Sequence, residues 1–94
     1  MTFVLTIPDE MRQKYIDRRA QDLGSLQGAL EKSDFEVFSK VGHQLRGNAA
    51  TFGYDSLGVL GEKLEQVAES HDAAEAEACL SALRSWIAQQ KAPK

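Results

Sequence analysis

The stretch SDFEVFSKVGHQLRGNAATFG, residues 33–53, carries the repeating pattern that decides the fold. Its apolar and small residues recur every three or four positions, which is the spacing of one face of an α-helix. Ser33, followed three residues later by Glu36, matches a capping box, so we expect Ser33 to begin this helix. Gly53 suits the residue that ends a helix. The residues expected to face the core are Phe38, Val41, Gly42, Leu45, Ala49 and Phe52.

One amphipathic segment precedes this helix. It begins near TIPDE, residues 6–10, because proline and acidic residues suit the first turn of a helix, and it extends to about Glu31. We expect the charged residues 17–19 to form a solvated face. Residues 3–7 are apolar except for Thr6, and we expect them to lie across the other helices as a short N-terminal cover segment. The core-facing positions of this helix are predicted to be Ile16, Ala20, Leu23 and Leu30.

Two further amphipathic segments follow the central stretch. We expect Asp55 or Ser56 to cap the third helix, and Asp72 to cap the fourth with Glu75 three residues later. Four such helices with short links predict an all-α fold, an antiparallel up-and-down four-helix bundle, with residues 1–94 as one domain. The inward positions are Leu57, Leu60, Leu64, Val67 and Ala68 in the third helix and Ala76, Cys79, Leu80, Leu83, Trp86 and Ile87 in the fourth.

Composition excludes several classes of protein. The 94 residues are 43% hydrophobic and 27% charged, as in ordinary globular domains. The net charge is −3 without a basic block, which argues against nucleic acid or an anionic membrane as the main partner. The single cysteine excludes an internal disulfide and, without a signal peptide, predicts a cytoplasmic protein. We expect a monomer.

His43 lies on the side of the central helix opposite the apolar face, because it falls about 160° from Leu45 on a helical wheel. Gly47 follows one turn later, although glycine inside a helix costs about 1 kcal/mol relative to alanine. Its missing Cβ leaves space beside the imidazole, and Arg46 is within reach of an anion on that ring. An ordinary imidazole is largely unprotonated at neutral pH and is a good nucleophile. Together these residues predict a site that receives a phosphoryl group.

The stretch HQLRGNAATFG, which begins at His43 and continues to Leu57, resembles the signature of the histidine-containing phosphotransfer (HPt) domains of multistep phosphorelays. The resemblance implies that His43 is phosphorylated on Nε2. It places Arg46 where the family usually has a lysine beside the phosphate, and Gly47 at the family's glycine. Asn48, where the family often has serine, is expected to pack rather than to react.

The resemblance also implies the partners. HPt proteins carry phosphoryl groups between receiver-domain aspartates and their own histidine, in pathways fed by a sensor histidine kinase. The sequence contains no glycine-rich phosphate loop and no carboxylate cluster, so we expect no cofactor or metal of its own, with Mg²⁺ supplied by the receiver. This makes the chain a carrier rather than an enzyme. We expect Ser39, Gln44 and Ala50 to take part in partner docking, together with part of the first helix.

Two other interpretations stay open. The chain could be a helical interaction module that is never phosphorylated, or the phosphorylatable input domain of a chemotaxis-type histidine kinase. The other candidate residues favour structural roles. His71 complements the negative end of the third helix, and Cys79 occupies an inward position typical of a small core residue.

Overall fold

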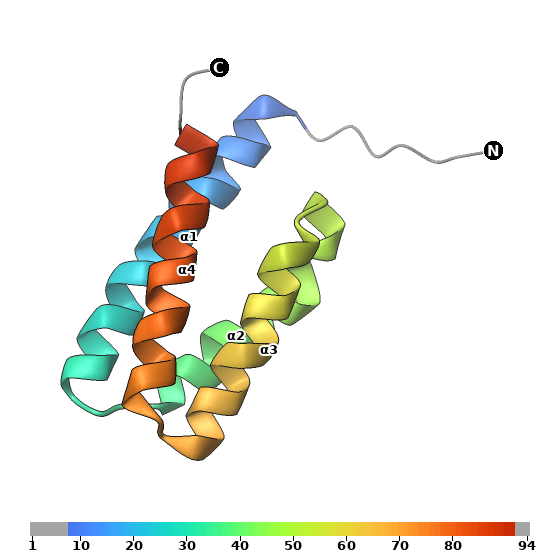
Figure 1. Ribbon diagram of the computed structural model, residues 1–94. Helices are drawn as coiled ribbons and strands as arrows, with labels where there is room; N and C mark the ends of the chain where they lie inside the picture. Colours follow the sequence, from blue (N-terminus) through green and yellow to red (C-terminus); the bar gives the residue numbers. More distant parts are fainter. Residues whose placement is uncertain (1–7, 92–94) are drawn as a thin grey trace.

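The structure is a computed structural model that describes residues 8–91, so the predicted cover segment at residues 3–7 lies outside the described residues. The described residues form four α-helices and one short 3-10 turn (Figure 1). The links between helices were predicted to have two to four residues, and those before α2 and α4 do; the link between α2 and α3 has six residues, because α2 ends at Asn48 and η1 follows it. The elements are α1 (Asp9–Glu31), α2 (Glu36–Asn48), η1 (Ala50–Phe52), α3 (Asp55–Ser70) and α4 (Ala73–Lys91).

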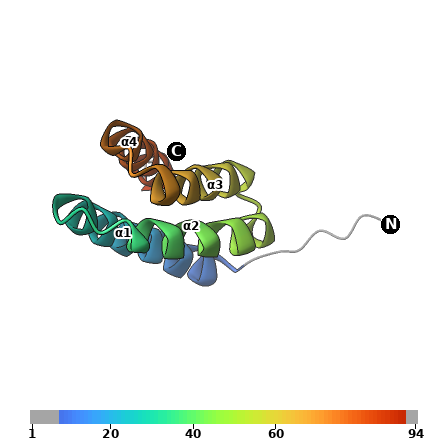
Figure 2. The same ribbon diagram turned by 90° about the horizontal axis from the view of Figure 1, so that it is seen from below.

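The helices form the predicted antiparallel up-and-down bundle. Each packs against its neighbours in the order α1, α2, α3, α4, and α4 returns to α1. Seen from below, α1 and α2 form one layer, and α3 and α4 form the other (Figure 2). The most extensive packing between two helices is that of α2 with α3. In the described part of the chain, no helix is long and apolar enough to cross a membrane.

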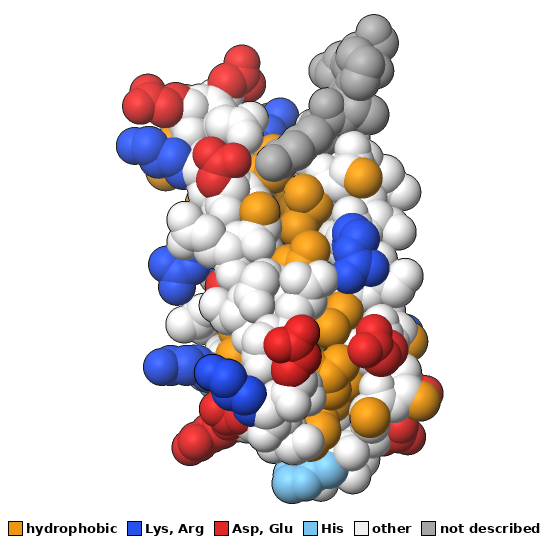
Figure 3. All heavy atoms as spheres, turned by 90° about the vertical axis from the view of Figure 1, so that its left-hand side faces the viewer, with side chains coloured by type: hydrophobic (Ala, Val, Ile, Leu, Met, Phe, Trp, Pro, Cys, Tyr) orange, Lys and Arg blue, Asp and Glu red, His pale blue; other side chains and the backbone are white. Residues whose placement is uncertain are grey.

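The core is built from the predicted faces of α2, α3 and α4. Of these positions only Phe52 and Ala68 are half-buried, and the others are buried. Cys79 lies within this core, and burial raises the pKa of its thiol. Hydrophobic side chains also form a band on the face where α1 meets α4, with charged side chains on either side (Figure 3). The largest fully buried side chains are Leu26, Phe38, Leu45, Leu57, Leu64 and Leu83.

The buried face of α1 differs from the prediction. Ile16 is buried as expected, but Ala20, Leu23 and Leu30 are only half-buried. Arg19 is 3% exposed, so the prediction of a solvated face at residues 17–19 was wrong for this residue. Arg19 and Asp22 tolerate burial because they form an ion pair, with 2.8 Å between Nε and Oδ2. The buried residues of α1 are Tyr15, Ile16, Arg19, Asp22, Leu26 and Ala29.

The predicted capping box at Ser33 was also wrong. Ser33 has a φ of 57° and belongs to the turn that ends α1. Its backbone N–H donates to the carbonyl of Leu30, and the N–H of Asp34 donates to that of Ala29 at 2.8 Å. These two bonds form a Schellman motif, which satisfies carbonyls at the end of a helix. Ser33 therefore terminates α1, and α2 begins after Phe35 without a side-chain cap.

Of the caps predicted for α3 and α4, only the one for α4 is present in the structure. Neither Asp55 nor Ser56 caps α3, because Tyr54 occupies the cap position and makes no side-chain bond. Asp72 does cap α4, since its Oδ1 accepts the backbone N–H groups of Ala74 and Glu75 at 3.0 and 3.2 Å. An aspartate therefore satisfies two backbone donors at the start of α4.

We expect Asp72→Ala to lower the free energy of unfolding by about 1 kcal/mol, because α4 loses this cap. Ser56→Ala is the matched control, since its exposed side chain caps nothing and its effect should stay within about 0.5 kcal/mol. Urea unfolding followed by circular dichroism measures both. Equal effects of the two substitutions would contradict the assignment of the cap.

Candidate functional site

His43 lies on the solvent side of α2. Its side chain is exposed, whereas Val41 and Leu45, two residues to either side, are buried in the core. Within the described part of the chain, the imidazole has no hydrogen-bond partner. No hydrogen bond within the protein therefore occupies either ring nitrogen, and the ring can be approached from solvent.

Gly47 leaves open space one turn beyond His43. A Cβ built at this residue would have no neighbouring atom within 4 Å. The glycine is therefore not required by packing inside the protein, and the surface is open at this position. The predicted docking residues Ser39 and Gln44 on α2 and Ala50 on η1 are also exposed.

Arg46 is exposed but is held by a residue that the sequence analysis did not single out. Its Nη1 lies 2.9 Å from Oε1 of Glu65 on α3, and the two side chains are 56% and 26% exposed. The guanidinium therefore bonds to α3 in this structure instead of lying free beside His43.

Two glycines bring α3 close to the helix that carries His43. A Cβ at Gly42 would lie 2.6 Å from the carbonyl oxygen of Gly61 and 2.9 Å from Cγ of Glu65. A Cβ at Gly61 would lie 2.7 Å from the carbonyl oxygen of Gly42 and 2.9 Å from the backbone nitrogen of Arg46. Because real Cβ atoms do not come this close, both positions require glycine. This contact sets the backbone position of the site relative to α3.

Asn48 links the end of α2 to α1, in agreement with the expectation that it packs. Its Oδ1 accepts a hydrogen bond from the Tyr15 hydroxyl at 2.8 Å and from Nη1 of Arg19 at 3.5 Å. The Arg19 guanidinium also lies over the Tyr15 ring, 4.4 Å from its centroid. Burial raises the pKa of the Tyr15 phenol, although the hydrogen bond and charge of Arg19 oppose the shift. This network fixes the turn that carries Gly47.

Aromatic side chains hold the segment after Asn48. The Phe52 ring stacks on Tyr15 at 4.2 Å between centroids, and Tyr54 packs edge-on against Trp86 of α4 at 4.9 Å. Gly53, with a φ of 80°, ends η1 rather than α2, so the predicted helix closes with a 3-10 turn. The site therefore lies on a helix anchored at its C-terminal end to both α1 and α4.

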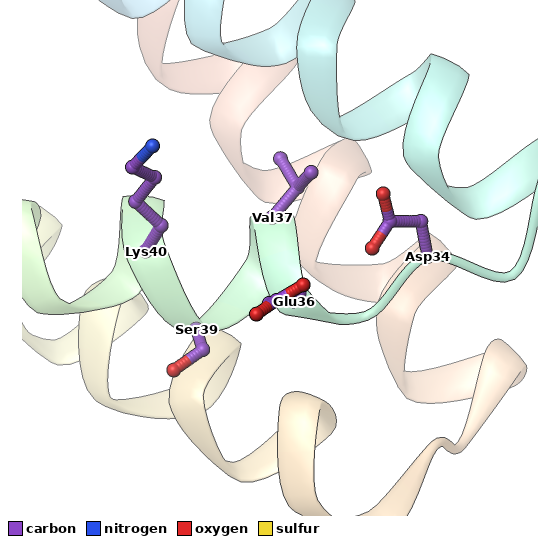
Figure 4. Close-up of a pocket in the computed structure, with 5 residues that line it drawn as sticks. All are labelled: Asp34, Glu36, Val37, Ser39 and Lys40. Carbon is purple, nitrogen blue, oxygen red and sulfur yellow. The ribbon is translucent and has the colours of Figure 1, made fainter.

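A hollow of about 370 Å³ opens beside the first turns of α2. Val37 and Lys40 point to one side of the helix and Ser39 to the other, with Asp34 on the preceding loop (Figure 4). His43 does not line this hollow. The candidate acceptor is thus on an open helical surface, and not inside a pocket that encloses a small substrate.

Sequence reasoning missed Glu65, Gly61 and Lys40. Lys40 is exposed and three residues before His43, a spacing that places the two side chains on neighbouring parts of one helix face. Glu65 and Gly61 give a weaker signal, because their role depends on how α3 is aligned with α2. Only the glycines within helical patterns at residues 42 and 61 hinted that two helices come close together.

The environment of the other candidate histidine, His71, indicates a structural role. His71 ends α3 with a φ of 57° and stacks on Phe35, with 4.6 Å between ring centroids. In the described part of the chain, no group of three or more histidine, cysteine or acidic residues is placed to hold a metal ion. Of the two histidines, His43 is therefore the better candidate for a chemical role.

Comparison with known proteins identifies the family. The family model described as Hpt domain matches residues 10–92, which is most of the chain and covers the four described helices except for Asp9, the first residue of α1. No curated protein and no solved structure matches the chain significantly. Hpt domains carry out histidine phosphotransfer in two-component signalling and interact there with receiver domains and kinases. The match over nearly the whole four-helix bundle shows that the chain belongs to the Hpt domain family.

Proposed function

We propose that this protein is a phosphorelay carrier that accepts and donates a phosphoryl group on His43. The observation that supports this most strongly is the exposed imidazole of His43 beside the open surface at Gly47, inside the region of the family match. Phosphoryl transfer needs access in line with the bond that breaks, and a histidine on an open helix provides it. The carrier turns over only with its partners, since its own chain has no phosphate-binding loop.

The proposed reaction exchanges one bond to phosphorus for another. The lone pair on Nε2 of His43 attacks the phosphorus of an aspartyl phosphate on the receiver and forms a P–N bond. The P–O bond to the aspartate breaks, and the carboxylate leaves with the electron pair. The proton on Nδ1 stays on the ring, and the reverse reaction loads another receiver.

The partners in this proposal are receiver domains and a sensor histidine kinase. The receiver supplies Mg²⁺, which neutralises charge on the transferring phosphoryl group. Ser39, Gln44 and Ala50 surround His43 on the exposed surface and are proposed as docking contacts. We expect these complexes to form between a monomer and its partner in the cytoplasm, and to dissociate quickly, as a relay requires.

The test is transfer of a radiolabelled phosphoryl group from a panel of phosphorylated receiver domains. We expect the protein to take up label that is labile in acid and stable in base, as phosphohistidine is. The chain has two histidines, so His71→Gln serves as the matched control for His43→Gln. Label should disappear in His43→Gln and persist in His71→Gln. If no receiver or kinase labels the wild-type protein, a helical binding module is the better interpretation.

A further inference from the structure

Glu65 stands out because it forms an ion pair with Arg46, a cation expected to stabilise a phosphoryl group on His43. We propose that Glu65 competes with that phosphoryl group for Arg46. Its carboxylate holds the guanidinium while His43 is unmodified and releases it when His43 is phosphorylated. This inference rests on the proposed function and adds a control on how strongly His43 retains its phosphoryl group.

The geometry gives Glu65 a defined position beside α2. Its Oε1 lies 2.9 Å from Nη1 of Arg46, and its Cγ lies beside the backbone of Gly42. The glycine contact between Gly42 and Gly61 holds the two backbones together at this level. Glu65 is therefore kept near Arg46 by main-chain packing, and not only by the ion pair itself.

The ion pair is weak enough to exchange. Arg46 is 56% exposed, and pairs accessible to solvent contribute little to stability. Arg46 is also three residues from His43 on the same helix, a spacing at which side chains meet. A phosphoryl group carries more negative charge than a carboxylate. Its oxygens can accept two parallel hydrogen bonds from the planar guanidinium. Phosphorylation should therefore draw Arg46 away from Glu65.

This exchange has a consequence for the relay. In the proposed exchange each phosphorylation breaks the pair between Arg46 and Glu65, so Glu65 makes the phosphorylated form less favourable than it would otherwise be. The bundle does not open when the pair breaks, because the α2–α3 contact at Gly42 and Gly61 does not involve it. Glu65 would thus ease unloading of His43 to the next receiver without disturbing the fold.

A simpler electrostatic effect must be separated from this exchange. The Glu65 carboxylate could disfavour the phosphorylated form by direct repulsion, without any role for Arg46. Exchange requires that Glu65 act through Arg46, whereas repulsion does not. A double-mutant cycle between the two residues distinguishes these mechanisms.

The experiment measures the equilibrium constant for phosphoryl transfer from one phosphorylated receiver domain. Four proteins are compared, the wild type, Glu65→Gln, Arg46→Gln and the double variant, with circular dichroism as a check on folding. Glu69→Gln is the matched control, because it removes the same charge one turn further along α3 at a residue that makes no ion pair with Arg46.

We expect Glu65→Gln to shift the equilibrium toward the phosphorylated protein by about two- to fivefold, the range for an exposed pair. In the Arg46→Gln background the same substitution should have no effect, and Glu69→Gln should have none in the wild type. An equal shift in both backgrounds would overturn the exchange in favour of direct repulsion, and no shift in either would overturn it outright. Absence of label on the wild type would instead contradict the proposed function.

Discussion

Gly47→Gln is expected to slow phosphoryl transfer by on the order of 100-fold while the protein stays folded. The added side chain leans toward the N-terminal end of α2 and covers the imidazole of His43. Transfer requires close and aligned contact between the ring and the phosphoryl group, so even a small displacement of the donor is costly. A Cβ at residue 47 would have no neighbouring atom within 4 Å. Glutamine also favours the helix more than glycine does.

Rapid-quench measurement of the transfer rate tests this, together with the free energy of unfolding. Ala88→Gln is the matched control, because it places the same side chain at an exposed position on α4, the helix diagonal to α2 in the bundle. We expect its transfer rate to stay within about twofold of the wild type, since α4 lies away from the site. Normal transfer by Gly47→Gln would show that the open surface at this glycine is not needed for access.

Gly42→Ala is expected to lower the free energy of unfolding by about 1–3 kcal/mol, although alanine favours helix. The new Cβ would lie 2.6 Å from the carbonyl oxygen of Gly61 and 3.0 Å from the backbone nitrogen of Glu65. Because both are main-chain atoms, they cannot turn aside, and α3 must move away from α2. The same movement would pull Glu65 from Arg46, so this one contact affects both stability and the site.

The control for this prediction is Gly24→Ala on α1. A Cβ at Gly24 meets no atom within 4 Å, so alanine there should raise the free energy of unfolding by about 0.4–1 kcal/mol. The two glycine-to-alanine substitutions should therefore have opposite signs in the same urea titration. If both substitutions stabilise the protein, α2 and α3 do not approach each other as closely as they do in the structure.

Local patterns predicted most of the fold. The buried faces of α3 and α4 were predicted because three- and four-residue spacing is a property of a single helix. The cap at Asp72 was predicted because a cap bonds only to the first turn of its own helix. Ser33 shows the limit of this reasoning. It lies between two helices, and the sequence pattern does not reveal whether it ends the first or begins the second.

Features that join two helices could not be predicted in the same way. Arg19 reads as a surface charge until Asn48 of α2 is brought beside it. Arg46 and Glu65 are 19 residues apart in the chain, and they meet only because of the alignment of α2 with α3. The exposure of His43 was the easier prediction, because it depends on one helix alone.

The most direct test of the whole account is to locate the phosphoryl group after transfer from a receiver domain. Nuclear magnetic resonance of the imidazole groups, with tandem mass spectrometry under basic conditions, assigns it to a residue and to a ring nitrogen. We predict that the phosphoryl group is on Nε2 of His43 and that His71 is unmodified. A phosphoryl group on His71, or none on either histidine, would contradict the central claim.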